Sequence, residues 1–426
     1  MALRSPQIIK QLLDRAKRFS SCCFLDDQHY ASALHEQDLL LGAGVVASIT
    51  FAPGDDLRRI DEWLTKHRGA WIFGHISYDL KQHLHGPYSS RPDPIGFSLM
   101  HFFVPEICVA LSGGKAEITS YAPSTDPAAF WELVGSTRPD PSGDGPTGAD
   151  IRARMDHATY MHTIKQLQGH ILRGDCYEIN FCQEFFAEGV RLSPVDTYHA
   201  LVKASPNPFS CYYRQGHAHL MCASPERFLA KRGSKIYSQP IKGTAARHLS
   251  DPEADVAARD ALLHSPKERS ENVMVVDLVR NDLSQVCAAG TVQVDELYGL
   301  YTYPQVHQMI STISGTLLPH VRFSDILTAT FPMGSMTGAP KHRVMQLIDE
   351  YEPSRRGLFS GSVGYFSPEG DLDLNVVIRS ILYNDATNYL SYQVGSGITW
   401  YADAEQEFEE CKLKAQAIRE VLGAGS

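Results

Sequence analysis

The stretch Glu271-Asn272-Val273-Met274-Val275-Val276-Asp277-Leu278-Val279-Arg280-Asn281-Asp282 places apolar residues at helical spacing. Its valines at 273, 276 and 279 return to one face of a helix with 3.6 residues per turn. Pro266, just upstream, stands where the first turn of a helix tolerates proline. We therefore predict a helix from Pro266 to Val286. Further helices are predicted over 156–173, with Asp156 as N-cap and Gly174 as the stop, over Lys341–Tyr351 and over Glu405–Leu422.

On both sides of this helix, short runs rich in β-branched and aromatic residues predict strands. These runs are Val45–Phe51, Ala70–Ile76, His101–Val104, His219–Ala223, Lys235–Ser238, Gly361–Phe366 and Tyr389–Val394. Strands and helices do not alternate strictly along the chain. That order favours an α+β fold, layered, with largely antiparallel sheets, over a doubly wound parallel sheet.

One low-complexity break divides the sequence. Residues 138–148 combine proline, glycine and acidic residues at a density typical of an exposed linker. We predict an N-terminal part over residues 1–137, which contributes to shared sheets, and a catalytic part over 149–426. The 426 residues are enough for two average domains or one large one.

The bulk composition excludes several classes of protein. Thirty-nine basic and 49 acidic residues give a formal net charge of -10, which argues against nucleic acid or an anionic membrane surface as the main partner. No apolar run approaches the roughly 20 residues that span a bilayer. Nine cysteines without metal-binding spacing indicate reduced, buried thiols. A cytoplasmic location is the expectation from these features.

Two predicted helices carry paired glutamates three residues apart, which places each pair on one helix face. The pairs are Glu268 with Glu271, and Glu407 with Glu410. Four carboxylates that face one another repel unless a cation lies between them, and a hard divalent ion such as magnesium prefers oxygen ligands. Taken alone, these residues are better explained as solvated acidic faces paired with nearby lysines. Those lysines are Lys267, Lys412 and Lys414.

Two basic residues stand near these acids or within apolar sequence. Lys414 follows Glu410 by four residues and projects from the same helix face. Arg379 lies in an apolar run, where a charged group needs a partner. An arginine there can grip a carboxylate with two parallel hydrogen bonds, or form a structural salt bridge in the core. The sequence leaves both roles open.

Three short segments could hold a small anion or a nucleophile. In Phe331–Lys341, exposed amides and the Thr337 hydroxyl precede a predicted helix and could bind an anion. Gly395–Ile398 follows a strand and could let backbone N–H groups approach a carboxylate. In Pro240–Thr244, Lys242 is expected at the end of a strand, and it becomes a nucleophile if burial or a neighbouring cation lowers its pKa. Taken alone, the first two segments are turns and Lys242 is an exposed loop lysine.

In their order and spacing, eight segments together resemble the chorismate-utilising enzymes, a family whose branches make anthranilate, aminodeoxychorismate, isochorismate or salicylate. They are Ser224–Phe228, Pro240–Thr244, Glu271–Asp282, Gly334–Lys341, Gly364-Tyr365, Ile378-Arg379, Gly395–Ile398 and Glu407–Glu410. The resemblance is strongest from Asp156 to the C-terminus. It implies one layered α/β/β/α unit. It also implies that the two acidic helix faces form a magnesium site and are not only solvated surface.

Two positions separate the branches of this family. The third residue of the Pro-Ile-x-Gly-Thr motif is typically alanine in the branch that makes anthranilate and lysine in the branch that makes aminodeoxychorismate, as at Lys242. The isochorismate and salicylate branches place a water-activating lysine in a neighbouring strand, where this sequence has Glu178. The resemblance therefore implies amination of chorismate, although a glutamate can also accept a proton.

The resemblance also implies a role for each site residue. Lys242 attacks ring C2 of chorismate, Glu226 protonates the departing C4 hydroxyl, and ammonia then replaces Lys242 by addition at C4. The product would be 4-amino-4-deoxychorismate, the precursor of 4-aminobenzoate and folate. Magnesium would be held by Glu271 and Glu410, helped by Glu268 and Glu407. The substrate-binding residues would be Arg379 and Tyr365 for the enolpyruvyl carboxylate, Thr337, Gly395, Gly397 and Lys414 for the ring carboxylate, and Thr244.

The resemblance further implies a glutaminase partner that supplies ammonia, since this chain has no room for such a domain beside the core. Two departures from the family pattern stand out. Gln308 occupies a position where many members have histidine, with His307 one place earlier. Asp27 stands where a serine often sits, so tryptophan binding is not predicted. The alternatives are another branch of the family, or a non-catalytic subunit that only binds chorismate.

Overall fold

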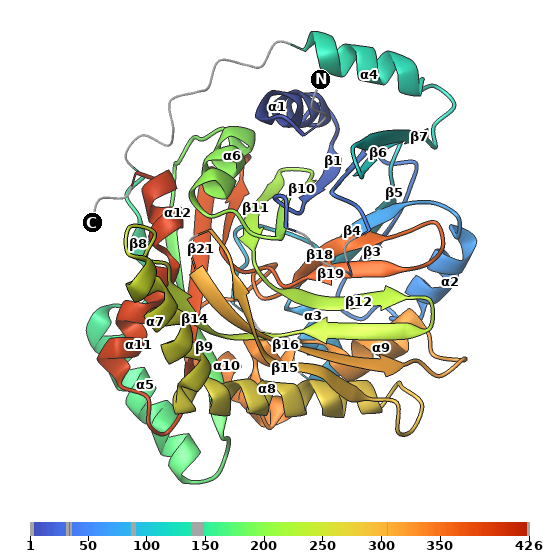
Figure 1. Ribbon diagram of the computed structural model, residues 1–426. Coiled ribbons are helices and arrows are strands. Elements are labelled where there is room, and N and C mark those ends of the chain that lie inside the picture. The colour runs from blue at the N-terminus through green and yellow to red at the C-terminus, as the bar shows by residue number, and fades with distance from the viewer. Residues whose placement is uncertain are drawn as a thin grey trace.

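The computed structural model describes residues 4–30, 34, 36–86, 91–137, 149–304 and 306–423. Within these ranges, eleven strands form one antiparallel sheet, called sheet A (Figure 1). In spatial order they are β17 (Gly338–Ala339), β9 (Glu178–Ala187), β21 (Tyr389–Ile398), β20 (Ser380–Asn384), β11 (Ala218–Ser224), β10 (Phe209–Gln215), β1 (Ser21–Asp26), β2 (Leu39–Ala43), β6 (Ile107–Ser112) and β7 (Lys115–Ser120), with β8 (Arg152–Ala153) paired to β9.

Ten strands of the described chain form a second sheet, called sheet B. In spatial order they are β14 (Ile241–Ala246), β16 (Val306–Thr316), β13 (Lys235–Gln239), β12 (Arg227–Arg232), β19 (Leu372–Asn375), β18 (Ser362–Phe366), β4 (Ile72–Ile76), β5 (Met100–Val104) and β3 (Ala47–Phe51), with β15 (Gln293–Thr302) paired to β16. Strands from the first 137 residues enter both sheets. The predicted linker at 138–148 lies outside the described residues, and the division into two parts stays a prediction.

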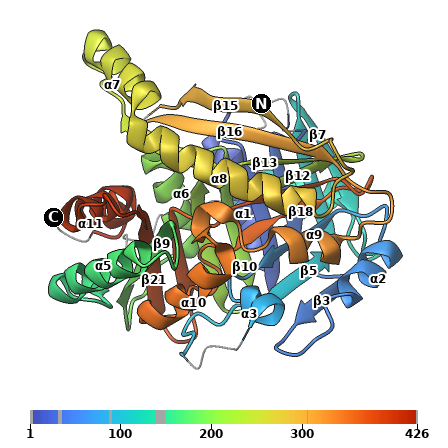
Figure 2. The ribbon, with the colours of Figure 1, turned by 90° about the horizontal axis from the view of Figure 1, so that it is seen from below.

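The helices flank the two sheets. They are α1 (Pro6–Ala16), α2 (Arg59–Lys66), α3 (Leu80–His85), α4 (Pro127–Ser136), α5 (His157–Leu172), α6 (Pro194–Ala204), α7 (Pro252–His264), α8 (Pro266–Ser284), α9 (Phe323–Thr330), the short 3₁₀ helix η1 (Gly334–Met336), α10 (Lys341–Tyr351), α11 (Ala404–Lys414) and α12 (Gln416–Val421). Helices α1, α4, α6 and α12 share a core with sheet A, whereas α8 and α9 pack against sheet B. Helix α7 projects from the rest of the molecule (Figure 2).

A continuous apolar core fills the space between the two sheets. Cys23 and Leu220 of sheet A lie in the same buried cluster as Phe73 and Phe103 of sheet B. The Phe73 ring packs so closely on β2 that a Cβ at Gly42 would meet it at 2.4 Å. Side chains from the two inner faces interdigitate, as expected for packed antiparallel sheets.

These features confirm the predicted α+β class with two packed, largely antiparallel sheets. The helix predicted from Pro266 ends at Ser284, and α10 has the predicted bounds. The helix predicted over Glu405–Leu422 is instead two helices that meet at Ala415. Lys242 was expected at the end of a strand and lies within β14.

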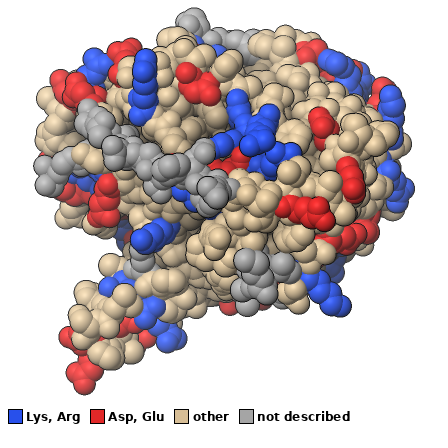
Figure 3. Space-filling model, turned by 90° about the horizontal axis from the view of Figure 1, so that it is seen from above, with Lys and Arg blue, Asp and Glu red and all other residues tan. Residues whose placement is uncertain are grey.

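The thiols and the surface agree with the composition. All nine cysteines are free and buried. Among the described residues, no helix is both long enough and apolar enough to cross a membrane. The face seen from above carries side chains of both signs, with one group of Lys and Arg near its middle (Figure 3).

Candidate active site

Lys242 owes its position to a bulge in β14. The antiparallel register between β14 and β16 shifts between the pairs Ile241–Ile310 and Thr244–Gln308. Gly243, next to Lys242, has a φ of +93°, in the left-handed region that favours glycine. A bulge of this kind re-aims a side chain and is common beside active sites. The PIKGT sequence therefore gives the backbone the freedom that turns Lys242 inward.

The Lys242 amine lies among groups from three other elements. It forms an ion pair with Glu178, the first residue of β9. Its Nζ is also 3.6 Å from Oε2 of Glu271 on α8. A Cβ at Gly397 of β21 would lie 3.0 Å from Lys242 Nζ and 2.7 Å from Glu178 Oε1. Gly397 thus leaves the room in which this ion pair forms.

The two carboxylates reverse the expected effect on Lys242. Burial by itself lowers the pKa of the amine, but Glu178 and Glu271 outweigh burial, so the pKa of Lys242 is raised. A lowered pKa, from burial or a neighbouring cation, was the condition for Lys242 to act as a nucleophile, and the free site does not meet that condition. The neighbours that decide the pKa are anions from β9 and α8, which are distant in sequence.

Glu226 lies between β11 and β12 and is 4% exposed. Its backbone is fixed by hydrogen bonds from its N–H to the Ser224 hydroxyl and from the Val376 N–H to its carbonyl oxygen. Burial raises the pKa of its carboxyl to about 7, while the Ser335 side chain and the Lys242 charge oppose this rise. The carboxyl is therefore protonated below about pH 7, as a general acid requires.

The four predicted metal-binding glutamates come from α8 and α11, and the lysines beside them bind some of them. Lys267 Nζ is 3.1 Å from Glu407 Oε1, and Lys414 Nζ is 2.6 Å from Glu410 Oε1. Burial raises the pKa of Glu268, and the nearby Glu410 charge adds to this rise. The two helices therefore place their acids within electrostatic reach of one another.

The surroundings of Glu271 disfavour the charged form of its carboxyl group. Burial raises the pKa of Glu271 to about 7, with Glu178 and Glu268 adding to burial and Lys242 opposing it. Its Oε1 is buried and has no hydrogen-bond partner. A buried carboxylate oxygen without a partner is costly, and a cation would relieve that cost.

The donor types at this place match a hard divalent ion, which prefers carboxylate oxygens. Within the described residues, however, no group of three or more His, Cys, Asp or Glu side chains is close enough together to hold an ion. The lysine contacts occupy Glu407 and Glu410 in this arrangement. Binding of an ion through both helices would require these side chains to leave their lysine partners.

Other predicted substrate-binding residues border the same place. Lys414 Nζ donates to the Gly395 carbonyl oxygen at 3.1 Å. Burial lowers the pKa of Arg379, and the negative charge of Glu410 partly offsets this decrease. The two side chains are therefore close enough for their charges to interact. Thr244 is exposed, two residues after Lys242 in β14. Interactions with Lys414 and Glu410 therefore connect Gly395 and Arg379, and Thr244 lies in the same strand as Lys242.

Thr337 differs from its expected presentation. It has no exposed surface, and its hydroxyl donates to the carbonyl oxygens of Met333 and Gly334 at 3.1 and 3.3 Å. From the sequence, this hydroxyl was expected to be available to bind an anion. In the folded chain its proton is donated within the turn, because the 3₁₀ helix leaves carbonyl groups that need hydrogen-bond donors.

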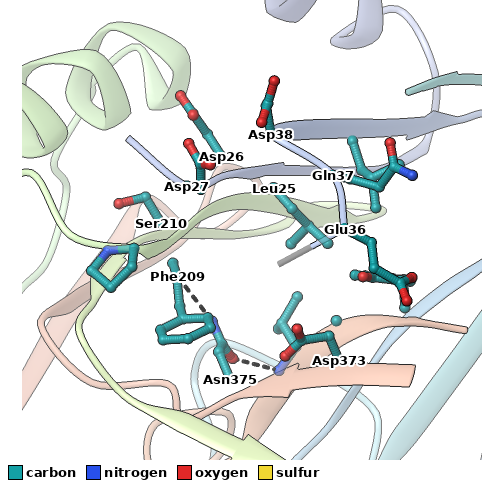
Figure 4. A pocket seen from close by; sticks show the side chains of 15 residues that line it. Leu25, Asp26, Asp27, Glu36, Gln37, Asp38, Phe209, Ser210, Asp373 and Asn375 are labelled. Atoms are coloured by element: carbon teal, nitrogen blue, oxygen red, sulfur yellow. Dashed lines mark hydrogen bonds between the residues drawn. The ribbon is translucent and has the colours of Figure 1, made fainter. Parts of the chain in front are cut away.

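Tyr365 is not brought to this site. It lines a separate pocket together with Asp27, Asp373 and Asn375 (Figure 4). Its ring packs on Trp71, with centroids 5.5 Å apart. Successive residues of β18 point to opposite faces of the sheet, and Tyr365 points to the face that borders this pocket. This placement separates Tyr365 from Arg379. The expected pairing of Tyr365 with Arg379 is not present in the structure.

Two further positions were singled out in the sequence. His307 is buried against Thr302 and Asp255, with ring-nitrogen distances of 3.0 and 3.2 Å. Gln308 is also buried, and its Oε1 has no hydrogen-bond partner. Glu178 was recognised only as the absence of a lysine, and its contact with Lys242 was missed. No local signal in the sequence joins residues 178 and 242.

The model of the chorismate binding enzyme family matches residues 21–420. The chain belongs to this family. This confirms the resemblance noted in the sequence and identifies the cluster around Lys242 as part of a chorismate-utilising fold. The relatives within the family divide among its branches.

Aminodeoxychorismate synthase component 1 of Klebsiella aerogenes is 40% identical over 267 residues, which cover 63% of this chain and 58% of that protein. Anthranilate synthase component 1 of Cereibacter sphaeroides is 32% identical over 371 residues, 82% of this chain and 73% of that protein. The crystal structure of anthranilate synthase component I from Streptococcus pneumoniae superposes with a TM-score of 0.78 at 26% identity, covering 92% of this chain and 93% of that one. This chorismate binding enzyme thus resembles members of more than one branch.

Proposed function

We propose that this chain converts chorismate and ammonia to 4-amino-4-deoxychorismate, the precursor of 4-aminobenzoate and folate. The observation that carries the proposal is the position of Lys242. Its amine lies in the centre of the site, between Glu178 and Glu271 and over Gly397. A lysine at this place offers a nucleophile that the chain itself supplies.

Glu178 adds to the argument against water as the nucleophile. Activation of water in the related branches relies on a lysine at this position, and here a carboxylate bonds to Lys242 instead. A carboxylate in direct contact with the Lys242 ammonium can accept its proton and release the neutral amine. The raised pKa of Lys242 in the free site makes such an acceptor necessary.

The proposed reaction consists of two displacements at the ring of chorismate. Lys242, after it transfers a proton to Glu178, attacks ring C2, both conjugated ring double bonds shift toward C4, and the C4 hydroxyl departs as water with a proton from Glu226. Ammonia then adds at C4 and loses a proton to Glu226, both double bonds shift back, and the Lys242 amine departs from C2 and regains its proton from Glu178. Because Lys242 holds the intermediate covalently, ammonia can replace a hydroxyl at the same carbon.

We further propose that Glu271 and Glu410, helped by Glu268 and Glu407, hold a magnesium ion. When bound, the ion would polarise the ring carboxylate and favour attack at C2. Support comes from the carboxylate donor set and from the partnerless Oε1 of Glu271. Arg379 and Lys414, two of the cations near these acids, would bind the carboxylates of the substrate.

Ammonia would come from a glutamine amidotransferase partner, and the location would be the cytoplasm. The name "component 1" of the Klebsiella aerogenes relative implies a second component there. Among the alternatives, the anthranilate branch is favoured by a relative that covers 82% of this chain. Lys242 is what separates the two branches, since that position is typically alanine in the anthranilate branch.

Product analysis tests the proposal directly. The purified chain is incubated with chorismate, magnesium and ammonium, and the products are separated and identified by mass. We expect 4-amino-4-deoxychorismate. Anthranilate, isochorismate or salicylate as the main product would overturn the assignment, and an absence of turnover with intact chorismate binding would favour a non-catalytic subunit.

The Lys242→Ala variant tests the covalent step. We expect amination with ammonium to fall by at least about 10³-fold in kcat, since the nucleophile is lost. Lys235→Ala is the matched control, because Lys235 is an exposed lysine in β13, the strand that precedes β14 in the chain. Amination that continues undiminished in Lys242→Ala would rule out the covalent mechanism.

A further inference from the structure

Arg356 is a buried cation outside the catalytic cluster, and only 1% of its side chain is exposed. It follows α10, and its guanidinium forms two hydrogen bonds with Glu352, at 2.9 Å through Nε and 2.6 Å through Nη2. Its Cζ lies 4.5 Å from the ring centroid of Tyr78. A buried arginine requires such an anionic partner, because its charge cannot be neutralised.

The remaining donors of Arg356 join two segments that carry site residues. Nη1 donates to the Met336 carbonyl oxygen at 2.7 Å, and Nη2 donates to the Asn180 carbonyl oxygen at 2.9 Å. Met336 directly precedes Thr337, and Asn180 lies two residues after Glu178 in β9. One guanidinium therefore fixes the spacing between the turn formed by residues 334–337 and the strand that presents Glu178 to Lys242.

Asn180 supplies the second part of this connection. Its Nδ2 donates to the Ser335 carbonyl oxygen at 2.7 Å, and its backbone N–H donates to the Thr337 carbonyl oxygen at 2.7 Å. Three successive carbonyl groups of the turn, at 335, 336 and 337, thus accept hydrogen bonds from Asn180 or Arg356. Glu352 completes the connection, since its Oε1 accepts from the Cys182 N–H at 2.9 Å.

The turn also packs on the apolar core, where Met336 is buried, and Gly334 lies against Leu278 and Val275 of α8. Among the described residues, its ladder connection to sheet A is the two-residue strand β17 directly after it, which pairs with Glu178 and Ile179. The Ser335 side chain, within the turn, is one of the groups that lower the pKa of the Glu226 carboxyl against the effect of burial. A shift of the turn would therefore alter the surroundings of both Glu226 and Thr337.

We propose that Arg356, together with Asn180, is a positioning residue for chorismate, which holds the 334–337 turn against β9 so that substrate and Glu226 meet in reactive geometry. This inference rests on the proposed function, because it takes chorismate as the ligand of the site. A displacement of about 1 Å in a site can lower turnover about 10²-fold, so neither residue needs to touch the substrate.

The Arg356→Lys variant tests the inference, since lysine keeps a charge for Glu352 but cannot reach both carbonyl groups in the fork geometry of arginine. We expect the KM for chorismate to rise at least 10-fold and kcat to fall at least 10-fold. The matched control is Arg214→Lys. The Arg214 guanidinium also donates to backbone carbonyl groups, those of Lys17, Phe19 and Gly216, away from the site.

The Asn180→Ala variant decides the question if Arg356→Lys fails to fold. It removes the bond to the Ser335 carbonyl together with the weaker side-chain contacts to the Met336 sulfur and the Cys182 thiol. We expect a rise in KM of at least 5-fold with a near-native circular dichroism spectrum. In the double variant, the two effects should combine to less than their product, because both residues hold one turn. KM and kcat within 2-fold of wild type in folded Asn180→Ala, or fully multiplicative effects, would overturn the inference.

The readout separates this inference from the proposed function. Turnover is followed as loss of chorismate, whatever the product, and the product is identified by mass in parallel. Anthranilate as the product would overturn the proposed function and leave the positioning test valid. If the wild-type chain does not turn over chorismate, its dissociation constant from calorimetry replaces KM, and an unchanged constant in Arg356→Lys and Asn180→Ala overturns the positioning role.

Discussion

Glu226 is the residue whose environment makes the clearest prediction at the scale of a single side chain. Burial raises the pKa of its carboxyl to about 7. As a general acid it acts only when protonated, so activity is expected below this pKa and is lost as the pH rises through about 7. We predict that kcat/KM for chorismate, measured with constant free ammonia, falls on the alkaline side of about pH 7.

The same residue provides the control. Glu226→Gln should lower kcat/KM about 10²- to 10⁴-fold, the usual contribution of general acid catalysis, and should remove this alkaline limb. Glu132→Gln alters an exposed glutamate of α4 and should leave the profile unchanged. An alkaline limb near pH 7 that persists in Glu226→Gln would assign the titration to another group.

At the scale of an element, the bulge of β14 is what presents Lys242. Gly243 has a φ of +93°, and a Cβ there would lie 3.0 Å from both Glu268 Oε2 and Leu262 Cδ1. Gly243→Ala should therefore strain the backbone by about 1–2 kcal/mol and also press on α7 and α8. We predict a loss of chorismate turnover of at least about 10-fold beyond what the stability change explains.

Gly233→Ala is the control that separates the loss of turnover from backbone strain. Gly233 also has a positive φ, +58°, in the turn between β12 and β13, but nothing lies within 4 Å of its added Cβ. In urea titrations, Gly233→Ala should lose the backbone strain energy alone and Gly243→Ala at least as much, and only Gly243→Ala should lose turnover. Equal turnover in the two variants would show that the bulge does not position Lys242.

At the scale of the whole molecule, His75 joins the two sheets. Its Nδ1 lies 2.9 Å from the Tyr213 hydroxyl of sheet A, and its Nε2 lies 2.9 Å from the Ser98 carbonyl oxygen. A carbonyl only accepts, so Nε2 carries the proton and Nδ1 accepts from Tyr213. Burial lowers the pKa of His75 to about 3, so the ring is neutral in the folded protein.

This depressed pKa links stability to pH. An unfolded histidine has a pKa near 6.5 and binds a proton that folded His75 rejects until about pH 3. The free energy of unfolding should therefore decrease as the pH falls below about 6.5, by about 2 kcal/mol from this group between about pH 7.5 and pH 5. We predict a smaller decrease in His75→Gln, measured by urea unfolding at both pH values.

His162→Gln is the control for this measurement, because His162 is exposed on α5. Its unfolding free energy should show the wild-type dependence on pH. If His75→Gln also keeps the wild-type dependence, then other buried groups, such as His101, whose pKa burial lowers to about 4, account for acid sensitivity.

Local chemistry explains which structural predictions succeeded. The helix at Lys341–Tyr351 and the Asp156 N-cap of α5 follow from residues within one turn of each other, and both are present. The break at Ala415, between α11 and α12, was not predicted, because no proline or glycine marks it in the sequence. Thr337 and Tyr365 depart from their expected settings because their side-chain directions depend on partners from distant segments.

The sequence by itself determined the α+β class, the helix that carries Glu268 and Glu271, and the motifs that identify a chorismate binding enzyme. It did so because periodicity, caps and motif spacing are local properties of the chain. Only the tertiary structure decided that Glu178 bonds to Lys242, that Glu226 is buried enough for its pKa to rise, and that Arg356 ties the 334–337 turn to β9. Contacts and burial between segments far apart in sequence arise when the two sheets pack, and no local pattern encodes them.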